Sequence, residues 1–250
     1  MNYKWLSGVG DYTMFLGKVF GRLPRLYKRR QEFILQIKRI GVDSLFLIAL
    51  TSAFTGLVTA LQAVYQAGRF SRSDLVGVLI GKSTMIELAP VLTALVLTGR
   101  VGASIAAEIG TMKVSEQLDA LRSMSISPDE FLYLPRIMAG LIAFPLITIF
   151  SDLVGIISGC LFFWLRFRVH YYNFFNNMRA AFEPFDLISG LTKALVFGFI
   201  ITSMGCFFGS RTTGGAEGVG RSTTLTVVYC SVLILIMDFF VAWALFNTPL

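Results

Sequence analysis

The chain has 250 residues, of which 55% are hydrophobic and only 15% are charged, and its net charge is +7. Globular domains contain about 25% charged residues, so this composition and the mean hydropathy of +0.69 argue against a soluble protein and favour one polytopic membrane domain. A single histidine excludes a histidine-rich metal cluster, and the three cysteines are too dispersed to share a metal ion.

The N-terminal residues 1–42 combine basic and apolar side chains. Lys and Arg are concentrated here, and apolar residues such as Phe15, Val19, Ile34 and Ile37 recur between them at helical spacing. Nucleic acid is one partner for a basic segment, but a basic amphipathic helix is typical of binding to anionic lipid at a membrane surface. We therefore expect an interfacial amphipathic helix with no nucleic-acid partner. We expect no signal peptide, because a compact apolar core and a cleavage motif are both missing.

Five apolar runs follow in residues 43–250. A helix needs roughly 20 apolar residues to cross a bilayer, and the runs cover approximately residues 44–64, 84–109, 131–164, 187–209 and 223–246. The third run is longer than one straight crossing and contains Pro135 and Pro145, so we expect it to bend or to project beyond the bilayer. The sequence therefore predicts an all-α integral membrane protein with five transmembrane helices, in which residues 1–42 form the interfacial segment and residues 43–250 the membrane domain.

The distribution of basic residues predicts the orientation of these helices. Lys and Arg near the ends of membrane spans favour the cytoplasmic side, and the N-terminal segment usually dominates. Because that segment is the most basic part of the chain, we expect the N-terminus in the cytoplasm and, after five crossings, the C-terminus on the outer side. The connection between the second and third spans would then be cytoplasmic.

Ionisable side chains interrupt several of the apolar runs. Glu87, Asp152, Lys193 and Asp238 lie inside these runs or at their edges, where a charge at the centre of a helix costs at least ~2.5 kcal/mol. Such groups either face a polar cavity or reach the headgroups from a helix end, and for Glu87 both alternatives stay open. In the expected topology Glu87, Lys193 and Asp238 share the outer level of the membrane, which favours a polar outer vestibule.

The stretch from residue 97 to residue 130 changes character twice. Arg100, Ser104 and Glu108 recur every four residues and predict one polar stripe along the second span. Val114, Leu118 and Leu121 then predict a short amphipathic helix, and a Ser-Pro pair at residues 127–128 marks the start of another helix. The short helix either carries force from a soluble partner or is a plain connector, and physical reasoning leaves both open.

Signals of catalysis are weak. Residues 77–84, GVLIGKST, look like the end of a phosphate-binding loop, but that loop needs four residues between its glycines and Gly77 and Gly81 are one residue too close. His170 lies among aromatic residues with no carboxylate at short helical spacing, which favours an interfacial hydrogen-bonding role over a catalytic base. We therefore expect no enzymatic site, metal or cofactor in this chain.

Two long segments resemble a known family. The stretch from Glu87, ELAPVLTALVLTGRVGASIAAEIGTMKVSEQLDAL, and the C-terminal GVGRSTTLTVVYCSVLILIMDFFVAWALF resemble the MlaE/YrbE permeases, the membrane subunits of ABC transporters that work with MCE proteins. The similarity extends from about residue 44 to the C-terminus. One difference affects the outer vestibule: many members have an arginine before the glutamate, and this chain has Ile86.

The resemblance implies partners and a location. It implies a homodimer in the inner membrane, two cytoplasmic ATPase subunits that bind the ATP and Mg²⁺, a periplasmic hexamer of MCE-domain protein, and room for a small accessory cytoplasmic subunit. It also implies that residues 112–124 form a coupling helix that fits a groove on the ATPase. The coupling residues would be Glu108, Met112, Glu116, Gln117, Leu118, Asp119 and Ala120.

The same resemblance assigns the substrate pathway. Glu87, Lys193 and Asp238 match positions at the outer lipid pathway, and amphiphilic reasoning places lipid tails on Leu57, Leu61 and Val64. The expected function is ATP-driven movement of phospholipid between the inner membrane and the outer envelope, which maintains outer-membrane lipid asymmetry. The alternatives are a non-transporting scaffold for envelope proteins, the same permease acting on sterols or other hydrophobic substrates, and an intramembrane lipid-modifying enzyme, which the scarcity of catalytic groups disfavours.

Overall fold

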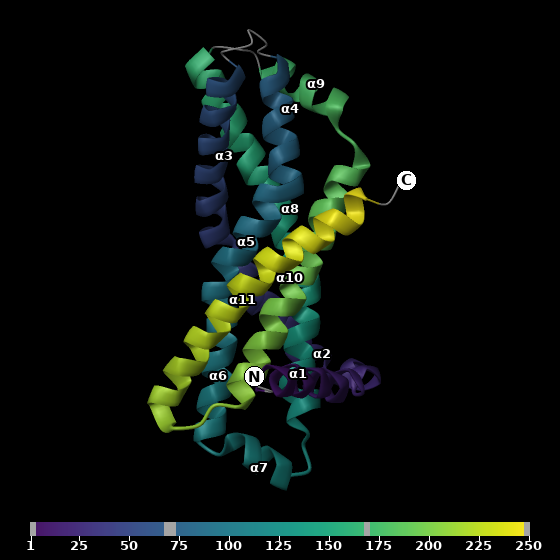
Figure 1. Cartoon of the computed structure of the whole chain (residues 1–250), viewed down its shortest axis with the longest axis vertical. Helices are drawn as coiled ribbons and strands as arrows, with labels where there is room; N and C mark the ends of the chain where they lie inside the picture. The colour runs from purple at the N-terminus through teal and green to yellow at the C-terminus, as the bar shows by residue number, and fades with distance from the viewer. Residues whose placement is uncertain (1–3, 68–73, 168–170, 248–250) are drawn as a thin grey trace.

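The computed structural model describes residues 4–67, 74–167 and 171–247, and throughout these ranges the chain is almost entirely helical (Figure 1). Five helical segments are long and apolar enough to span a membrane, as the sequence predicts: Arg30–Tyr65, Gly77–Val114, Asp129–Arg166, Pro184–Ser210 and Gly215–Phe246. The all-α class and the number of spans are therefore confirmed. His170 lies outside the described residues.

The N-terminal segment is helical and lies across the long axis of the molecule (Figure 1). It comprises α1 (Lys4–Phe20), the 3₁₀ helix η1 (Leu23–Arg29), α2 (Arg30–Ile40) and the short 3₁₀ helix η2 (Val42–Ser44). Part of its apolar side packs on the core, where Val19 is completely buried, while Met14 and Ile34 are more than 60% exposed and basic side chains such as Arg25 and Lys38 are exposed as well. This division between faces is the one expected of an amphipathic segment.

The first two spans run along the long axis. The first is α3 (Leu45–Ala67), and the second is a continuous helical path through α4 (Asp74–Ser83), η3 (Thr84–Leu88), α5 (Ala89–Leu97), η4 (Thr98–Gly102) and α6 (Ala103–Val114). Both η3 and η4 are wider, π-helical turns, in which the backbone N–H donates to the carbonyl five residues earlier. Pro90 accounts for η3, because proline cannot donate the regular bond and its ring clashes with the carbonyl one turn back.

The remaining elements complete the bundle. The short helix α7 (Gln117–Ser123) and the π turn η5 (Asp129–Tyr133) lead into α8 (Leu134–Phe167), and α9 (Tyr171–Ala181), α10 (Pro184–Ser210) and α11 (Gly215–Phe246) follow. With 34 residues, α8 is about 50 Å long, whereas the hydrocarbon layer is about 30 Å thick, so this span is longer than one straight crossing requires, and its projection beyond the bilayer stays a prediction. The helices α7 and α9 lie at opposite ends of the molecule (Figure 1), which we call the α7 end and the α9 end.

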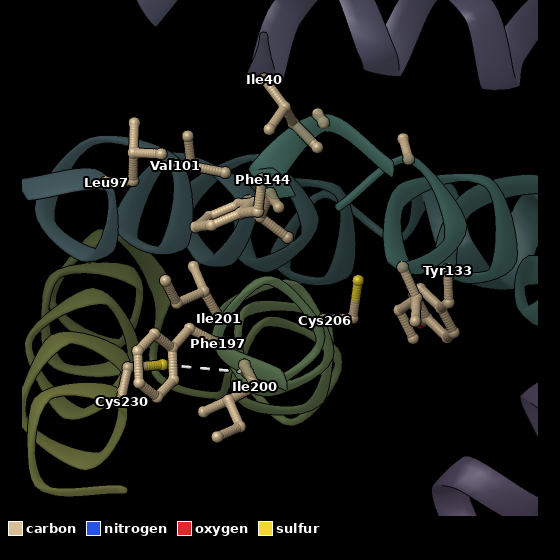
Figure 2. Packing of buried hydrophobic residues seen from close by; sticks show 14 of the residues in the cluster. Ile40, Leu97, Val101, Tyr133, Phe144, Phe197, Ile200, Ile201, Cys206 and Cys230 are labelled. Carbon is tan, nitrogen blue, oxygen red and sulfur yellow. Dashed lines mark hydrogen bonds between the residues drawn. The ribbon is translucent and has the colours of Figure 1, made fainter. Parts of the chain in front are cut away.

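The core is built where α8 and α10 pack against their neighbours. Leu97, Phe144, Phe197 and Ile201 interlock between α5, α8 and α10 with almost no exposed surface (Figure 2). Close approach of α3 to α8 needs glycine, because a Cβ on Gly56 would overlap the carbonyl oxygen of Gly155. Large apolar side chains cover the outer faces of α3, α8 and α11, as expected of surfaces in contact with lipid.

Candidate functional site

Three ionisable residues from different spans meet in the half of the molecule nearer the α9 end. The Nζ of Lys193, on α10, lies 2.5 Å from Oε2 of Glu87 in η3 and 2.8 Å from Oδ1 of Asp238 on α11. Lys193 is completely buried, whereas the Glu87 side chain is 47% exposed and that of Asp238 18% exposed. The structure thus brings together the three residues that the sequence places at one level. We call Glu87, Lys193 and Asp238 the charged cluster.

Local backbone features explain how the charged cluster forms. The π turn before Pro90 widens the helix at Glu87. Gly190 lets α10 approach this turn, because a Cβ there would overlap the carbonyl oxygen of Met85. Lys193 follows Gly190 by about one helical turn, on the same face. A buried ammonium is tolerated only when it is paired, and here two carboxylates surround it.

A cavity of about 510 Å³ adjoins Glu87 between α3 and α4. Its polar lining comes from Thr59 and Gln62 of α3, Lys82 and Ser83 of α4, and Glu87 itself, while its apolar lining includes Leu79, Ile86 and Leu88. Lys82 also pairs with Glu183 at 3.1 Å and with Asp186 at 3.4 Å, which ties α4 to the start of α10. A cavity with both kinds of wall fits an amphiphile, with its polar end at Glu87.

The apolar residues predicted on α3 are not part of this cavity. Leu57, Leu61 and Val64 do not line it, and Val64 packs instead on the smaller apolar cluster around Phe163 and Phe174. Leu61 is 56% exposed on the outside of the bundle. None of the three residues therefore shares the cavity wall with Glu87, and their contact with lipid tails stays a prediction.

The cavity instead uses α3 residues that the sequence analysis missed. Thr59 and Gln62 line it, and together with Thr55 one turn earlier they recur at i, i+4 and i+7 along a largely apolar helix, which is the spacing of one helical face. Residues 59 and 61 are separated by about 200° around the helix axis, so a face that contains Thr59 cannot also contain Leu61. The periodicity of the polar residues was the available signal.

At the α7 end, the predicted coupling segment is not one helix over residues 112–124. The helix α6 ends at Val114, Glu116 adopts a left-handed backbone with a φ of 58°, and α7 begins at Gln117. A left-handed residue cannot continue a right-handed helix, so the chain turns here. Val114 and Leu118 consequently do not lie on one continuous amphipathic face: Val114 is 39% exposed, while Leu118 is 1% exposed.

The coupling residues divide into exposed and internal positions. Glu116, Gln117 and Ala120 are exposed, whereas Leu118 inserts into the core and anchors α7. Asp119 bridges Lys113 at 3.2 Å and Arg122 at 2.9 Å. The hydrogen bond from Lys113 is the main cause that lowers the pKa of the Asp119 carboxyl below its ordinary value.

Glu108 and Met112 take part in internal contacts. Glu108 of α6 forms an ion pair with the buried Arg136 of α8 at 2.8 Å and a second one with Arg39 of α2 at 3.4 Å. It therefore links α6 to both α8 and α2. Met112 packs on the main apolar core. Glu108, whose side chain is 41% exposed, and Met112 therefore connect α6 to the rest of the molecule and are not part of the exposed surface of α7.

Comparison with known proteins identifies similar chains. Residues 33–244 match the family described as permease MlaE. The chain is 42% identical over 246 residues to a probable ABC transporter permease protein of Rickettsia typhi, covering 98% of this chain and 94% of the relative. It is 37% identical over 243 residues to a probable ABC transporter permease protein of Synechocystis, with coverages of 97% and 92%. It is also 33% identical over 235 residues to the intermembrane phospholipid transport system permease protein MlaE of Haemophilus influenzae, with coverages of 94% and 90%.

Proposed function

The chain belongs to the MlaE permease family, and from this we propose that it is the membrane subunit of an ABC transporter that moves phospholipid between the inner membrane and the outer envelope. The observation that carries the proposal is the charged cluster beside a cavity of about 510 Å³ with polar and apolar walls. A sterol lacks charged groups to match Glu87 and Lys82, so the cavity favours a phospholipid.

The cavity assigns a part to each region of the lipid. Glu87 is the exposed member of the charged cluster, so its carboxylate receives the cationic part of a headgroup, while Lys82 on the same wall attracts the phosphate. The apolar wall of Leu79, Ile86 and Leu88 receives the start of the acyl chains. Lys193 holds Glu87 in place from the buried side and does not need to touch the lipid.

The exposed surface of α7 receives the ATPase, the separate subunit that binds ATP and Mg²⁺. Glu116, Gln117 and Ala120 form the contact, and the buried Leu118 makes α7 move together with the core. A displacement of α7 by the ATPase is then transmitted to α8 through α6 and the Glu108–Arg136 ion pair. The α7 end faces the cytoplasm, and the α9 end faces a hexamer of MCE-domain protein in the periplasm. The functional unit contains two copies of this permease, with a small accessory subunit on the cytoplasmic ATPases.

Reconstitution tests this function. The complete complex in proteoliposomes should transfer fluorescent phospholipid to acceptor vesicles in an ATP-dependent manner, and should not transfer a fluorescent sterol. Glu87→Gln should reduce transfer at unchanged ATPase docking, whereas Glu217→Gln, an acid outside the cavity on α11, should leave transfer unchanged. Glu116→Ala combined with Asp119→Ala should abolish ATP-dependent transfer. Normal transfer in these variants would show that the sites are wrongly assigned, and absence of any transfer by the complete complex would favour a scaffold.

A further inference from the structure

A second cavity, of about 300 Å³, lies nearer the α7 end, between the α2–η2 segment and the second span. The predicted polar stripe of Arg100, Ser104 and Glu108 faces it from η4 and α6, and Gln36, Arg39 and Asp43 face it from the other side. Its residues are different from those of the cavity beside Glu87. The proposed transport pathway therefore does not account for it.

Two charges in this cavity lack a partner of opposite sign. Among the described residues, Arg100 makes no ion pair, and its guanidinium donates to the hydroxyl of Ser44. Asp43, which is exposed on the same cavity, also makes no ion pair within the described part of the chain. Arg39 and Glu108 differ, because they pair with each other at 3.4 Å. An unpaired guanidinium within a membrane span is costly in free energy, so we expect an anion to bind next to Arg100.

Gln36 is a third residue of this cavity whose polar group has no partner among the described residues. It is only 8% exposed and lines the cavity, yet its side-chain amide makes none of the hydrogen bonds found among the described residues. Its amide atoms are not among the fully buried side-chain atoms that lack a partner, so the amide reaches accessible space at the cavity wall. The cavity thus combines an unpaired cation, an unpaired anion and an amide donor without a partner within one small volume.

We propose that this cavity binds the headgroup of an amine-bearing phospholipid, a phosphodiester that carries a primary ammonium group. The phosphate accepts hydrogen bonds from the guanidinium of Arg100 and the amide of Gln36, because a guanidinium matches phosphate oxygens in a fork geometry. The ammonium donates to the carboxylate of Asp43. The acyl chains extend over Val42, which precedes Asp43 and is 57% exposed, and over Phe46, which follows Asp43 by three residues and is 82% exposed. This site goes beyond the proposed transport function, and neither depends on the other.

Site-resolved crosslinking of the full complex in detergent tests the proposal. The probe is phosphatidylethanolamine with a photoreactive group near the glycerol, and mass spectrometry maps its crosslinks. We expect crosslinks to residues 36–46, and unlabelled phosphatidylethanolamine should compete for them better than phosphatidylglycerol does.

Arg100→Gln should weaken the binding of both lipids roughly tenfold, as expected for the loss of one charged hydrogen bond. Asp43→Asn should remove only the preference for the amine. Lys38→Gln, an exposed cation of α2 outside the cavity, is the matched control and should have no effect.

Because Arg100→Gln also removes the contact to Ser44, Gln36→Glu provides a second variant. The added carboxylate pairs with Arg100 internally and repels the phosphate, so the fold should be retained, as checked by thermal unfolding, while the crosslink is lost. Unchanged crosslinking in both variants would overturn the site. An unchanged lipid preference in Asp43→Asn would overturn the amine assignment. Soluble glycerophosphoethanolamine should compete weakly, and competition equal to that of the lipid would show that the ligand is the free headgroup compound.

Discussion

Lys193 illustrates how a charged residue is accommodated inside a membrane protein. Its ammonium is completely buried and contacts two carboxylates that approach from η3 and α11. Removing one partner of such a buried group leaves the other charges uncompensated, which costs more than the pair itself contributes. Lys193 therefore holds three spans together, in addition to fixing Glu87 at the wall of the cavity.

Lys193→Met should destabilise the protein by about 3–5 kcal/mol, because Glu87 and Asp238 lose their shared cation. Denaturant unfolding in detergent micelles measures the change. Lys38→Met, which removes an exposed cation of α2, should cost about 0.5 kcal/mol or less. Adding Asp238→Asn to Lys193→Met should recover part of the loss. Equal effects of the two lysine substitutions would show that burial does not set the cost.

Tyr12 on α1 has a titration that should report on the docking of the N-terminal segment. Its hydroxyl lies 2.7 Å from that of Ser203 on α10, and burial raises its pKa from 10.0 to about 12. Because the pKa of Tyr12 is higher in the folded state than in the unfolded state, Tyr12 contributes fully to the free energy of unfolding below pH 10. This contribution is lost as the pH rises towards 12. The difference in tyrosinate absorbance between the wild type and Tyr12→Phe should show this late titration. A difference curve with a midpoint near 10 would mean that Tyr12 is exposed and α1 undocked.

At the scale of elements, the length of the apolar runs predicted the membrane spans, whereas the local backbone geometry between α6 and α7 was not predicted. Runs of about 20 apolar residues locate all five spans because water is absent from the bilayer core and the backbone must bond internally. The break at Ser115–Glu116 was missed because neither residue is a glycine or proline, the residues that most often mark a positive φ or the end of a helix. Helical periodicity alone therefore predicted one amphipathic helix across the residues where the chain turns.

Glu116→Gly should stabilise the junction of α6 and α7 by up to about 1 kcal/mol, because glycine adopts a φ of 58° without strain. Glu116→Val should destabilise it by about 1–2 kcal/mol, since a β-branched residue is disfavoured in the left-handed region. Thermal unfolding measures both. Gln117→Val, one residue later in α7, should cost less than Glu116→Val because it meets only the lower helix propensity of valine. The same cost at both positions would contradict a left-handed Glu116.

The site shows the same limit on prediction from sequence. The charged cluster was predictable, because Glu87, Lys193 and Asp238 are rare charges at one depth and each needs a partner. The cavity wall was missed because the prediction followed apolar residues and not the polar periodicity of Thr59 and Gln62, which lie on the face that α3 turns towards α4 when Gly56 packs on Gly155. Apolar residues such as Leu61 occur on every face of α3, so hydrophobicity could not select one.

At the scale of the whole molecule, the second span connects both ends. One continuous helical path carries Glu87 in the charged cluster, Arg100 in the second cavity and Glu108 in the contacts to α2 and α8, and it ends beside α7. The π turns at Glu87 and Arg100 lie on this path, and π turns interrupt the regular hydrogen bonding of a helix at functional positions. We therefore expect a displacement of α7 to be transmitted to both cavities through this one span.

The orientation of the molecule is a prediction at this scale, and cysteine labelling tests it. Ser123→Cys on α7 and Asn176→Cys on α9 introduce thiols at exposed positions at opposite ends. A membrane-impermeant maleimide added to intact spheroplasts should label the α9 variant at once and the α7 variant only after permeabilisation, because the basic N-terminal segment holds the α7 end in the cytoplasm. The natural Cys160, Cys206 and Cys230 are buried and should give little background. The opposite labelling order would reverse the orientation, and it would place the proposed ATPase surface of α7 on the side of the membrane that lacks ATP.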